Sequence, residues 1–74
     1  MNKIPANGSL IQHIEKGSVY RVTDDAGMIK DGGDWKQAIY YRRIDPATLA
    51  ESGPVFGQPI GPMLRKFTEW KGPK

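Results

Sequence analysis

The pattern of hydrophobic and polar residues is most typical of a strand in the middle of the chain, where residues 35–44 read WKQAIYYRRI. A short run rich in isoleucine and aromatic residues predicts a strand. Side chains alternate across a strand, so one face carries Ile39, Tyr41 and Arg43, and the other carries Ala38, Tyr40, Arg42 and Ile44. Apolar residues on both faces indicate a central strand of a sheet, or a barrel strand that is partly covered outside.

A second strand is predicted at residues 18–22, SVYRV, with Val19 and Arg21 on one face and Tyr20 and Val22 on the other. The two strands are separated by residues 24–34, which are rich in aspartate and glycine, the residues that favour turns. We expect a long hairpin loop there, with a short extension of strand at Met28 and Ile29.

Residues 9–17, SLIQHIEKG, fit two structures. Ser9 and Gln12 have the spacing of a helix capping box, and Gly17 is a typical helix end, so the pattern favours a helix of about two turns. The same residues also fit an edge strand, because short apolar runs do not distinguish the two.

The last third of the chain is divided by proline and glycine. Asp45, Pro46 and Gly53 predict one or two helical turns over residues 45–53. Residues 54–62, PVFGQPIGP, hold three prolines, so we expect a short edge strand at Val55 and Phe56 and an extended loop after it. Residues 63–70, MLRKFTEW, are predicted to form a closing strand.

These elements predict a mainly β domain with small α+β character. The expected architecture is a bent antiparallel sheet, or an SH3-like partly open barrel, of three to five strands with one or two short helical turns. An open α+β sandwich with one helix on the sheet is the alternative. The 74 residues form one domain, 1–74, with a core at about 9–70 and frayed tails at 1–8 and 71–74.

Composition adds few constraints. The formal net charge of +3 gives a mild attraction to anions, which by itself is too small to indicate nucleic-acid binding. The chain has no cysteine and one histidine, so no metal site is expected. The first residues lack the apolar run of a signal peptide, and no stretch approaches 18 apolar residues, so a cytoplasmic protein is expected.

Three short motifs, KGSVYRV at 16–22, AIYYRR at 38–43 and GPMLRKFTEW at 61–70, occur in order along the chain. They resemble the Lys-Gly-x-x-Tyr-x-Val, Val-x-Tyr-Arg and Pro-hydrophobic-x-x-Phe motifs of short bacterial and phage domains of unassigned function with SH3-like barrels. The acidic turn at 24–34 and the predicted helical segment at 46–52 depart from that pattern. The resemblance implies a barrel with a binding role and no known reaction.

No arrangement typical of catalysis occurs, so we expect neither an enzyme nor a bound cofactor. His13 has apolar neighbours, as a partly buried structural histidine does. Asp24, Asp25, Asp31 and Asp34 lack the spacing of an EF-hand calcium loop, and aspartates in turns commonly bond their own backbone. The alternative for these aspartates is a weak cation site or an acidic contact patch.

Basic and aromatic residues are interleaved on the predicted strands, a composition typical of interfaces. Arg42 and Arg43 are expected on opposite faces unless the strand bulges there. The residues predicted to contact a partner are Arg21, Tyr41, Arg43, Arg65, Lys66 and Trp70.

The leading hypothesis is a non-enzymatic binding module of phage or mobile-element type. It would dock on a host protein, such as a polymerase or a defence factor, and modulate or inhibit it. One alternative is nucleic-acid binding through the face with Tyr41, Arg43 and the Arg65–Lys66 pair. Another is a small-ligand or nucleotide sponge with a site near residues 54–62.

Overall fold

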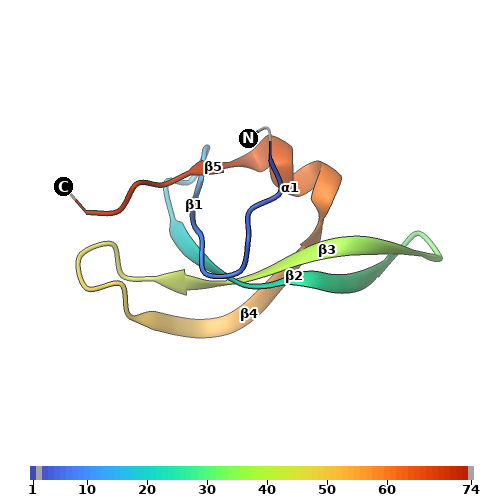
Figure 1. The fold of residues 1–74 in the computed structure, drawn as a ribbon, viewed down its shortest axis with the longest axis horizontal. Coiled ribbons are helices and arrows are strands. Elements are labelled where there is room, and N and C mark those ends of the chain that lie inside the picture. The colour runs from blue at the N-terminus through green and yellow to red at the C-terminus, as the bar shows by residue number, and fades with distance from the viewer. Residues whose placement is uncertain (2, 74) are drawn as a thin grey trace.

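Five strands and one short helix make up the computed structural model, which describes residues 1 and 3–73 (Figure 1). Asn2 and Lys74, which belong to the two predicted tails, lie outside the described residues. In chain order the elements are β1 Leu10–His13, β2 Val19–Asp31, β3 Asp34–Ile44, β4 Glu51–Pro59, α1 Ile60–Lys66 and β5 Phe67–Glu69.

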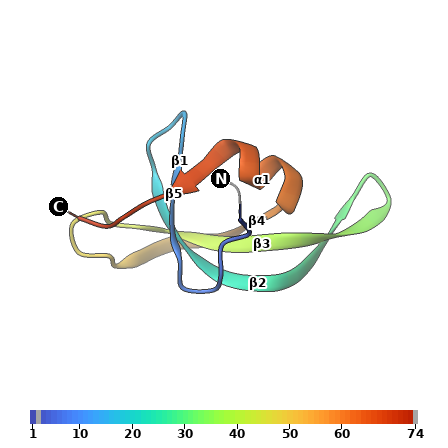
Figure 2. The ribbon, with the colours of Figure 1, turned by 45° about the horizontal axis from the view of Figure 1, so that its top comes forward.

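All five strands belong to one antiparallel sheet in the order β4-β3-β2-β1-β5. The sheet bends, so that β1 and β5 stand beside α1 above the β2–β3–β4 layer (Figure 2). It does not close, because β4 and β5 are its two edges. The prediction of a mainly β fold with a bent antiparallel sheet is confirmed, and the geometry is consistent with a small open barrel. We call the face that carries α1 the inner face, and the opposite one the outer face.

Within residues 9–17, Leu10–His13 form the strand β1, so the favoured helix prediction was wrong there. Ile11 pairs with Tyr20 of β2 on one side and with Glu69 of β5 on the other. The strand is therefore internal to the sheet rather than at its edge. Backbone partners on both sides, distant in sequence, outweigh the weak local preference of so short a segment for a helix.

The predicted long loop at residues 24–34 is mostly strand. β2 continues to Asp31, β3 begins at Asp34, and only Gly32 and Gly33 turn between them, with φ of 62° and 92°. Positive φ at both central residues is the type I′ geometry that matches the twist of a hairpin, and glycine adopts it without steric cost. Two register shifts between Val22 and Gly27 absorb the extra residues as bulges.

Residues 45–50 form a tight turn and not the predicted helix. Asp45 Oδ1 accepts hydrogen bonds from the backbone N–H groups of Ala47 (2.7 Å) and Thr48 (3.2 Å). One helical bond forms, from Leu49 N–H to the Asp45 carbonyl at 2.7 Å. Leu49 then adopts φ of 66°, a left-handed conformation that ends the turn, and β4 starts at Glu51.

Residues 60–66, of which 63–66 were assigned to a closing strand, are the helix α1. Pro59 is at its N-cap and Pro62 lies in the first turn, where the missing N–H costs nothing. Only Phe67–Glu69 form a strand. Upstream, Val55 and Phe56 lie on an edge strand as expected, but that strand spans Glu51–Pro59.

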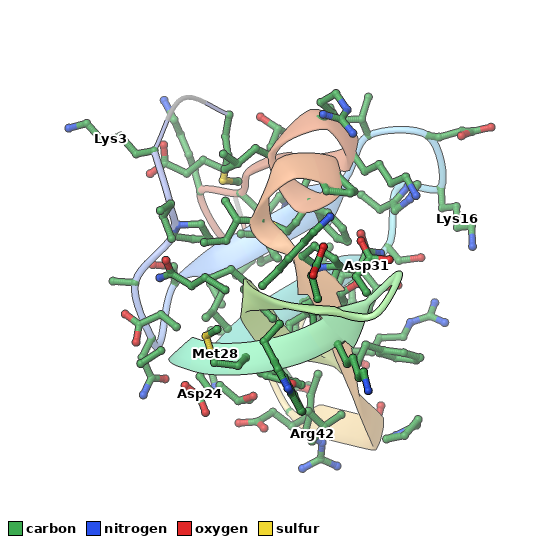
Figure 3. All side chains as sticks on the ribbon, turned by 90° about the vertical axis from the view of Figure 1, so that its right-hand side faces the viewer. Lys3, Lys16, Asp24, Met28, Asp31 and Arg42 are labelled. Carbon is green, nitrogen blue, oxygen red and sulfur yellow. The ribbon has the colours of Figure 1, made fainter. Side chains whose placement is uncertain are left out.

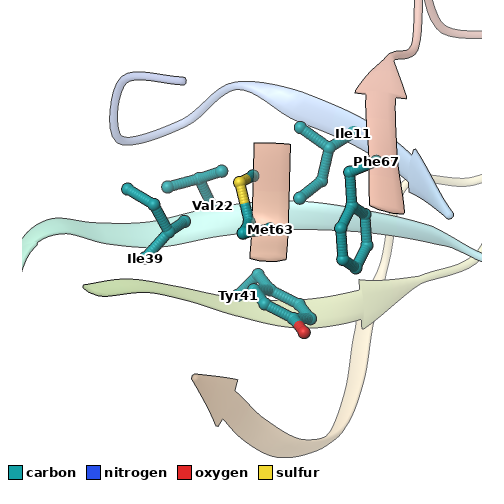
Figure 4. Close-up of a cluster of buried hydrophobic side chains, with 6 residues drawn as sticks. All are labelled: Ile11, Val22, Ile39, Tyr41, Met63 and Phe67. Carbon is teal, nitrogen blue, oxygen red and sulfur yellow. The ribbon is translucent and has the colours of Figure 1, made fainter. Parts of the chain in front are cut away.

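The core lies between the inner face and α1 (Figure 4). Met63 of α1 is fully buried in a cluster with side chains from four strands of the sheet, β1, β2, β3 and β5. The core cluster consists of Ile11, Val22, Ile39, Tyr41, Met63 and Phe67.

On the outer face the ring of Tyr40 lies across both neighbouring strands. A Cβ on Gly27 of β2 would come within 2.3 Å of the ring, and one on Gly57 of β4 within 2.5 Å. The Tyr40 hydroxyl donates to the Met28 carbonyl at 2.6 Å. Because both positions are glycine, the ring can pack directly against the backbone, and Tyr40 of β3 contacts both β2 and β4.

The N-terminal segment runs along the bent part of the sheet. The Met1 amine donates to the Leu64 carbonyl at 2.8 Å, and the Met1 side chain contacts the core cluster. Gly8 N–H donates to the Val22 carbonyl, and Val22 N–H donates to the Ser9 carbonyl. Within residues 1 and 3–73, no helix is long and apolar enough to cross a membrane.

Candidate binding surfaces

The six residues predicted to contact a partner do not gather on one surface. Tyr41 is only 4% exposed and belongs to the core. The other five lie on the outer face, on the inner face, at the end of α1 and beyond β5, as described below.

Arg21 and Arg42 are directly opposite each other on β2 and β3, and both face Glu51 at the start of β4. Glu51 is 3.3 Å from the Arg21 guanidinium and 3.6 Å from that of Arg42. Arg42 also donates twice to the Gly53 carbonyl, at 3.1 and 2.9 Å. Figure 3 shows Arg42 on the side of the sheet away from α1. These two arginines therefore hold the start of β4.

Arg43 is exposed and is opposite Tyr20 of β2 on the inner face. The expected separation of Arg42 and Arg43 onto opposite faces therefore holds. The register shift at this point lies in β4, where Gly53 and Pro54 are the extra residues between the partners of Arg42 and Arg43.

Two of the remaining predicted residues, Arg65 and Trp70, line separate hollows. Arg65 borders one of about 440 Å³ between α1 and the β2–β3 hairpin, with Asp31 and Lys36 opposite. Trp70 borders an open cavity of about 680 Å³ beside the N-terminal segment, with Lys3 and Ile4 among its lining. Lys66 is exposed at the last turn of α1.

A row of aromatic rings crosses the inner face. The Tyr20 ring lies 5.1 Å from Tyr41, 6.1 Å from Phe56 and 5.7 Å from Phe67, each edge to face. Phe56, on the edge strand β4, ends the row and is 43% exposed. Phe67 meets His13 at 5.1 Å, and His13 Nδ1 accepts a hydrogen bond from the Lys16 N–H. His13 therefore has a packing and turn-forming role in this structure.

Burial raises the pKa of the Tyr41 phenol above its ordinary value of 10.0. A hydrogen bond from the Gln58 side chain lowers that pKa in part, and the nearby Tyr20 raises it. The phenol is thus held in its neutral form within the core.

The far half of the β2–β3 hairpin, residues 28–37, projects beyond the rest of the molecule, and we call it the arm (Figure 1). Trp35 near its tip is 66% exposed, more than any other large hydrophobic residue described, and Met28 is 50% exposed. Trp35 is opposite Lys30, and Met28 is opposite Gln37. Trp35 and Met28 are thus diagonal neighbours on one face of the arm.

The aspartates near the arm mostly bond nearby backbone or side-chain groups. Asp24 Oδ1 accepts from the Ala26 N–H at 2.9 Å, and Asp25 Oδ2 from the Asn7 N–H at 3.1 Å. Asp31 pairs with Lys36 across the hairpin at 3.2 Å. Figure 3, which looks at the molecule from the arm side, shows Asp31 toward α1 and Met28 away from it. In the described part of the chain, no group of three or more His, Asp or Glu residues could hold a metal ion.

Sequence reasoning missed Trp35, Met28 and Phe56 as candidate contacts. The available signal was DGGDW at 31–35, in which two glycines between paired residues indicate a two-residue turn that places Trp35 near a hairpin tip.

No protein-family model, curated protein or solved structure matches the chain. The likeness to SH3-like domains stays a prediction, and the case for function depends on the surfaces described above.

Proposed function

We propose that this protein is a binding module that uses the arm as a preformed anchor, with Trp35 and Met28 entering an apolar pocket of a partner protein. The observation that carries the proposal is the exposure of Trp35 beside Met28 on one face of a projecting hairpin. Single exposed apolar residues are common on protein surfaces. Two diagonal neighbours on an arm with a fixed type I′ turn are a stronger signal.

The arm is built to keep its shape without a partner. Its turn needs no strained residue, and Tyr40 clamps its base through Gly27 and the Met28 carbonyl. Presenting a tryptophan on a rigid element lowers the ordering cost of binding, and tryptophan is enriched among residues that dominate interface energies.

The charge of the arm favours a protein over nucleic acid. Lys30, Asp31, Asp34 and Lys36 carry two positive and two negative charges at its tip. A β-ribbon can enter the major groove of DNA, but two carboxylates there would oppose the phosphates. The resemblance to bacterial and phage domains makes a host protein, such as a polymerase or a defence factor, the first partner class to test.

The test starts with capture of partners from a native lysate by the wild type, identified by mass spectrometry, followed by affinity measurement with the purified partner. Trp35→Ser is expected to weaken binding by about 30-fold or more, the cost of losing a dominant interface residue. Ile14→Ser is the matched control, because Ile14 is 61% exposed and lies outside the arm.

A partner bound equally well by wild type and Trp35→Ser would contradict the proposal. If binding is lost only in Arg43→Glu and Arg65→Glu, the surface predicted from sequence is the one used. Binding of a labelled oligonucleotide at about 50 mM salt, lost steeply as salt rises, would support the nucleic-acid alternative instead.

A further inference from the structure

β4 is an edge strand, so the backbone groups that it directs away from β3 have no partners in the sheet. Which groups these are follows from the hydrogen bonds of β2. Val22 N–H donates to the Ser9 carbonyl, and the Val22 carbonyl accepts from Gly8 N–H, so both groups point away from β3. Val22 and Tyr41 therefore form a non-hydrogen-bonded pair. Backbone groups alternate in direction along a strand, so those of Tyr41 point to Phe56 on β4.

This alternation fixes which groups of β4 face outward. Phe56 and Gln58 direct their N–H and C=O groups to β3, and Val55 and Gly57 direct theirs to the open edge. Pro59, opposite Ala38, takes an outward position where its missing N–H leaves the ladder intact. Val55 and Gly57 thus present two donors and two acceptors on either side of Phe56.

The side chains of this edge suit a second copy of the same strand. Val55 is 56% exposed and Phe56 is 43% exposed. Residues 52–64 contain no charged side chain, so two such edges meet without like-charge repulsion. Natural edge strands usually carry charges or prolines that prevent pairing. Here the prolines are at 54 and 59, and residues 55–58 between them contain neither a proline nor a charge.

We propose that two copies of the chain associate by antiparallel pairing of β4 with β4, about a two-fold axis at Phe56. Val55 of each copy then pairs with Gly57 of the other, and the four outward groups of each strand are all used. Phe56 faces Phe56 of the second copy in a non-hydrogen-bonded pair, where side chains approach most closely. A contact of this kind uses the same patch on both copies, so no further copy can add and the assembly is a closed dimer.

The geometry leaves room for the rest of the molecule. Each α1 begins four residues from the axis, so the two helices stand about 26 Å apart along the strands, at about 3.3 Å per residue. The dimer leaves both arms free, so this inference is independent of the function proposed for Trp35.

Sedimentation equilibrium tests the proposal. We expect a reversible monomer–dimer equilibrium in the range of about 1 µM to 1 mM. Phe56→Glu and Phe56→Lys are each expected to be monomeric, because each places two like charges at the axis. Mixed in equal amounts, the two variants should form a heterodimer in native mass spectrometry. Trp35→Glu is the matched control and should dimerise as the wild type does.

A chain that stays monomeric to about 1 mM, open-ended assemblies, or dimers that survive both Phe56 variants overturn the proposal. So does a mixture of folded variants that yields no heterodimer. Should the variants fail to fold, amide exchange of the wild type decides the question. The N–H groups of Val55 and Gly57 should be protected at high concentration and exchange freely on dilution, and exchange that is independent of concentration contradicts pairing.

Discussion

The ring of Tyr40 lies so close to Gly57 that a Cβ at this position would sit 2.5 Å from the nearest ring carbon. The close approach is repeated at Gly27 on the other side of the same ring. Two glycines in two strands thus make the space in which one tyrosine joins β2, β3 and β4.

Gly57→Ala is expected to destabilise the fold by about 1–3 kcal/mol, because the ring of Tyr40 must move off the sheet to admit a methyl group. Urea unfolding followed by circular dichroism measures the change. Gly61→Ala is the control: its Cβ would meet only the Arg65 guanidinium at 3.9 Å, and alanine favours a helix. Equal losses in both variants would mean that the ring contact is not the cause.

Met63→Ala is expected to cost about 2–5 kcal/mol, since it empties the centre of the core and removes the main contact that holds α1 on the sheet. A domain of this size is only marginally stable, so we expect the variant to be largely unfolded at room temperature. Thermal unfolding monitored by near-UV circular dichroism reports the loss. Arg65→Ala, two residues on and exposed, should change stability by less than about 0.5 kcal/mol.

Glu51→Gln should lower stability by less than about 1 kcal/mol, because the three side chains are about one-third exposed. The variant leaves Arg21 and Arg42 facing each other without a carboxylate between them. The loss should shrink in about 1 M salt, which screens the repulsion between the two arginines. Urea midpoints at low and high salt measure it, and a loss that is the same at both would exclude charge as the cause.

The raised pKa of the Tyr41 phenol predicts that the protein loses stability at alkaline pH. Burial raises its pKa in the folded protein, so the unfolded chain releases the phenol proton first. The contribution is fully present below the unfolded pKa of about 10 and is lost as pH rises through the folded value. Chemical denaturation from pH 8 to pH 12 should therefore show a steeper alkaline decline in the wild type than in Tyr41→Phe. Parallel curves would contradict this origin.

The strands that are richest in β-branched and aromatic residues were predictable from sequence. Residues 35–44 and Val19–Val22 lie in strands as predicted, and Tyr20 and Val22 face inward together. Their β-branched and aromatic residues are numerous enough to fix the type of element.

Segments decided by distant partners were not predictable. Residues 10–13 are a strand because β2 and β5 supply backbone partners, which no local pattern reveals. Residues 60–66 are helical because Met63 fills the core above the sheet, although residues 63–70 were predicted to form a strand. At 45–50, the cap predicted at Asp45 is real, but Leu49 turns left-handed after one turn.

The residues predicted to contact a partner were also only partly predictable from sequence. Arg43 could be assigned to a face from sequence, and it is exposed. Tyr41 was assigned to the same face, but that face is the core side, and composition alone could not tell which side α1 would cover.

The pairing of β1 with β5 joins segments near opposite ends of the chain, whereas β2 and β3 are joined by two residues. Closing a long loop costs more chain entropy than closing a hairpin. We therefore expect the β2–β3 hairpin to form before β1 pairs with β5. During synthesis, Ile11 and His13 have no neighbour on one side until the last strand leaves the ribosome. A refolding experiment with pulsed amide labelling should accordingly find the amides of β2 and β3 protected before those of β1 and β5.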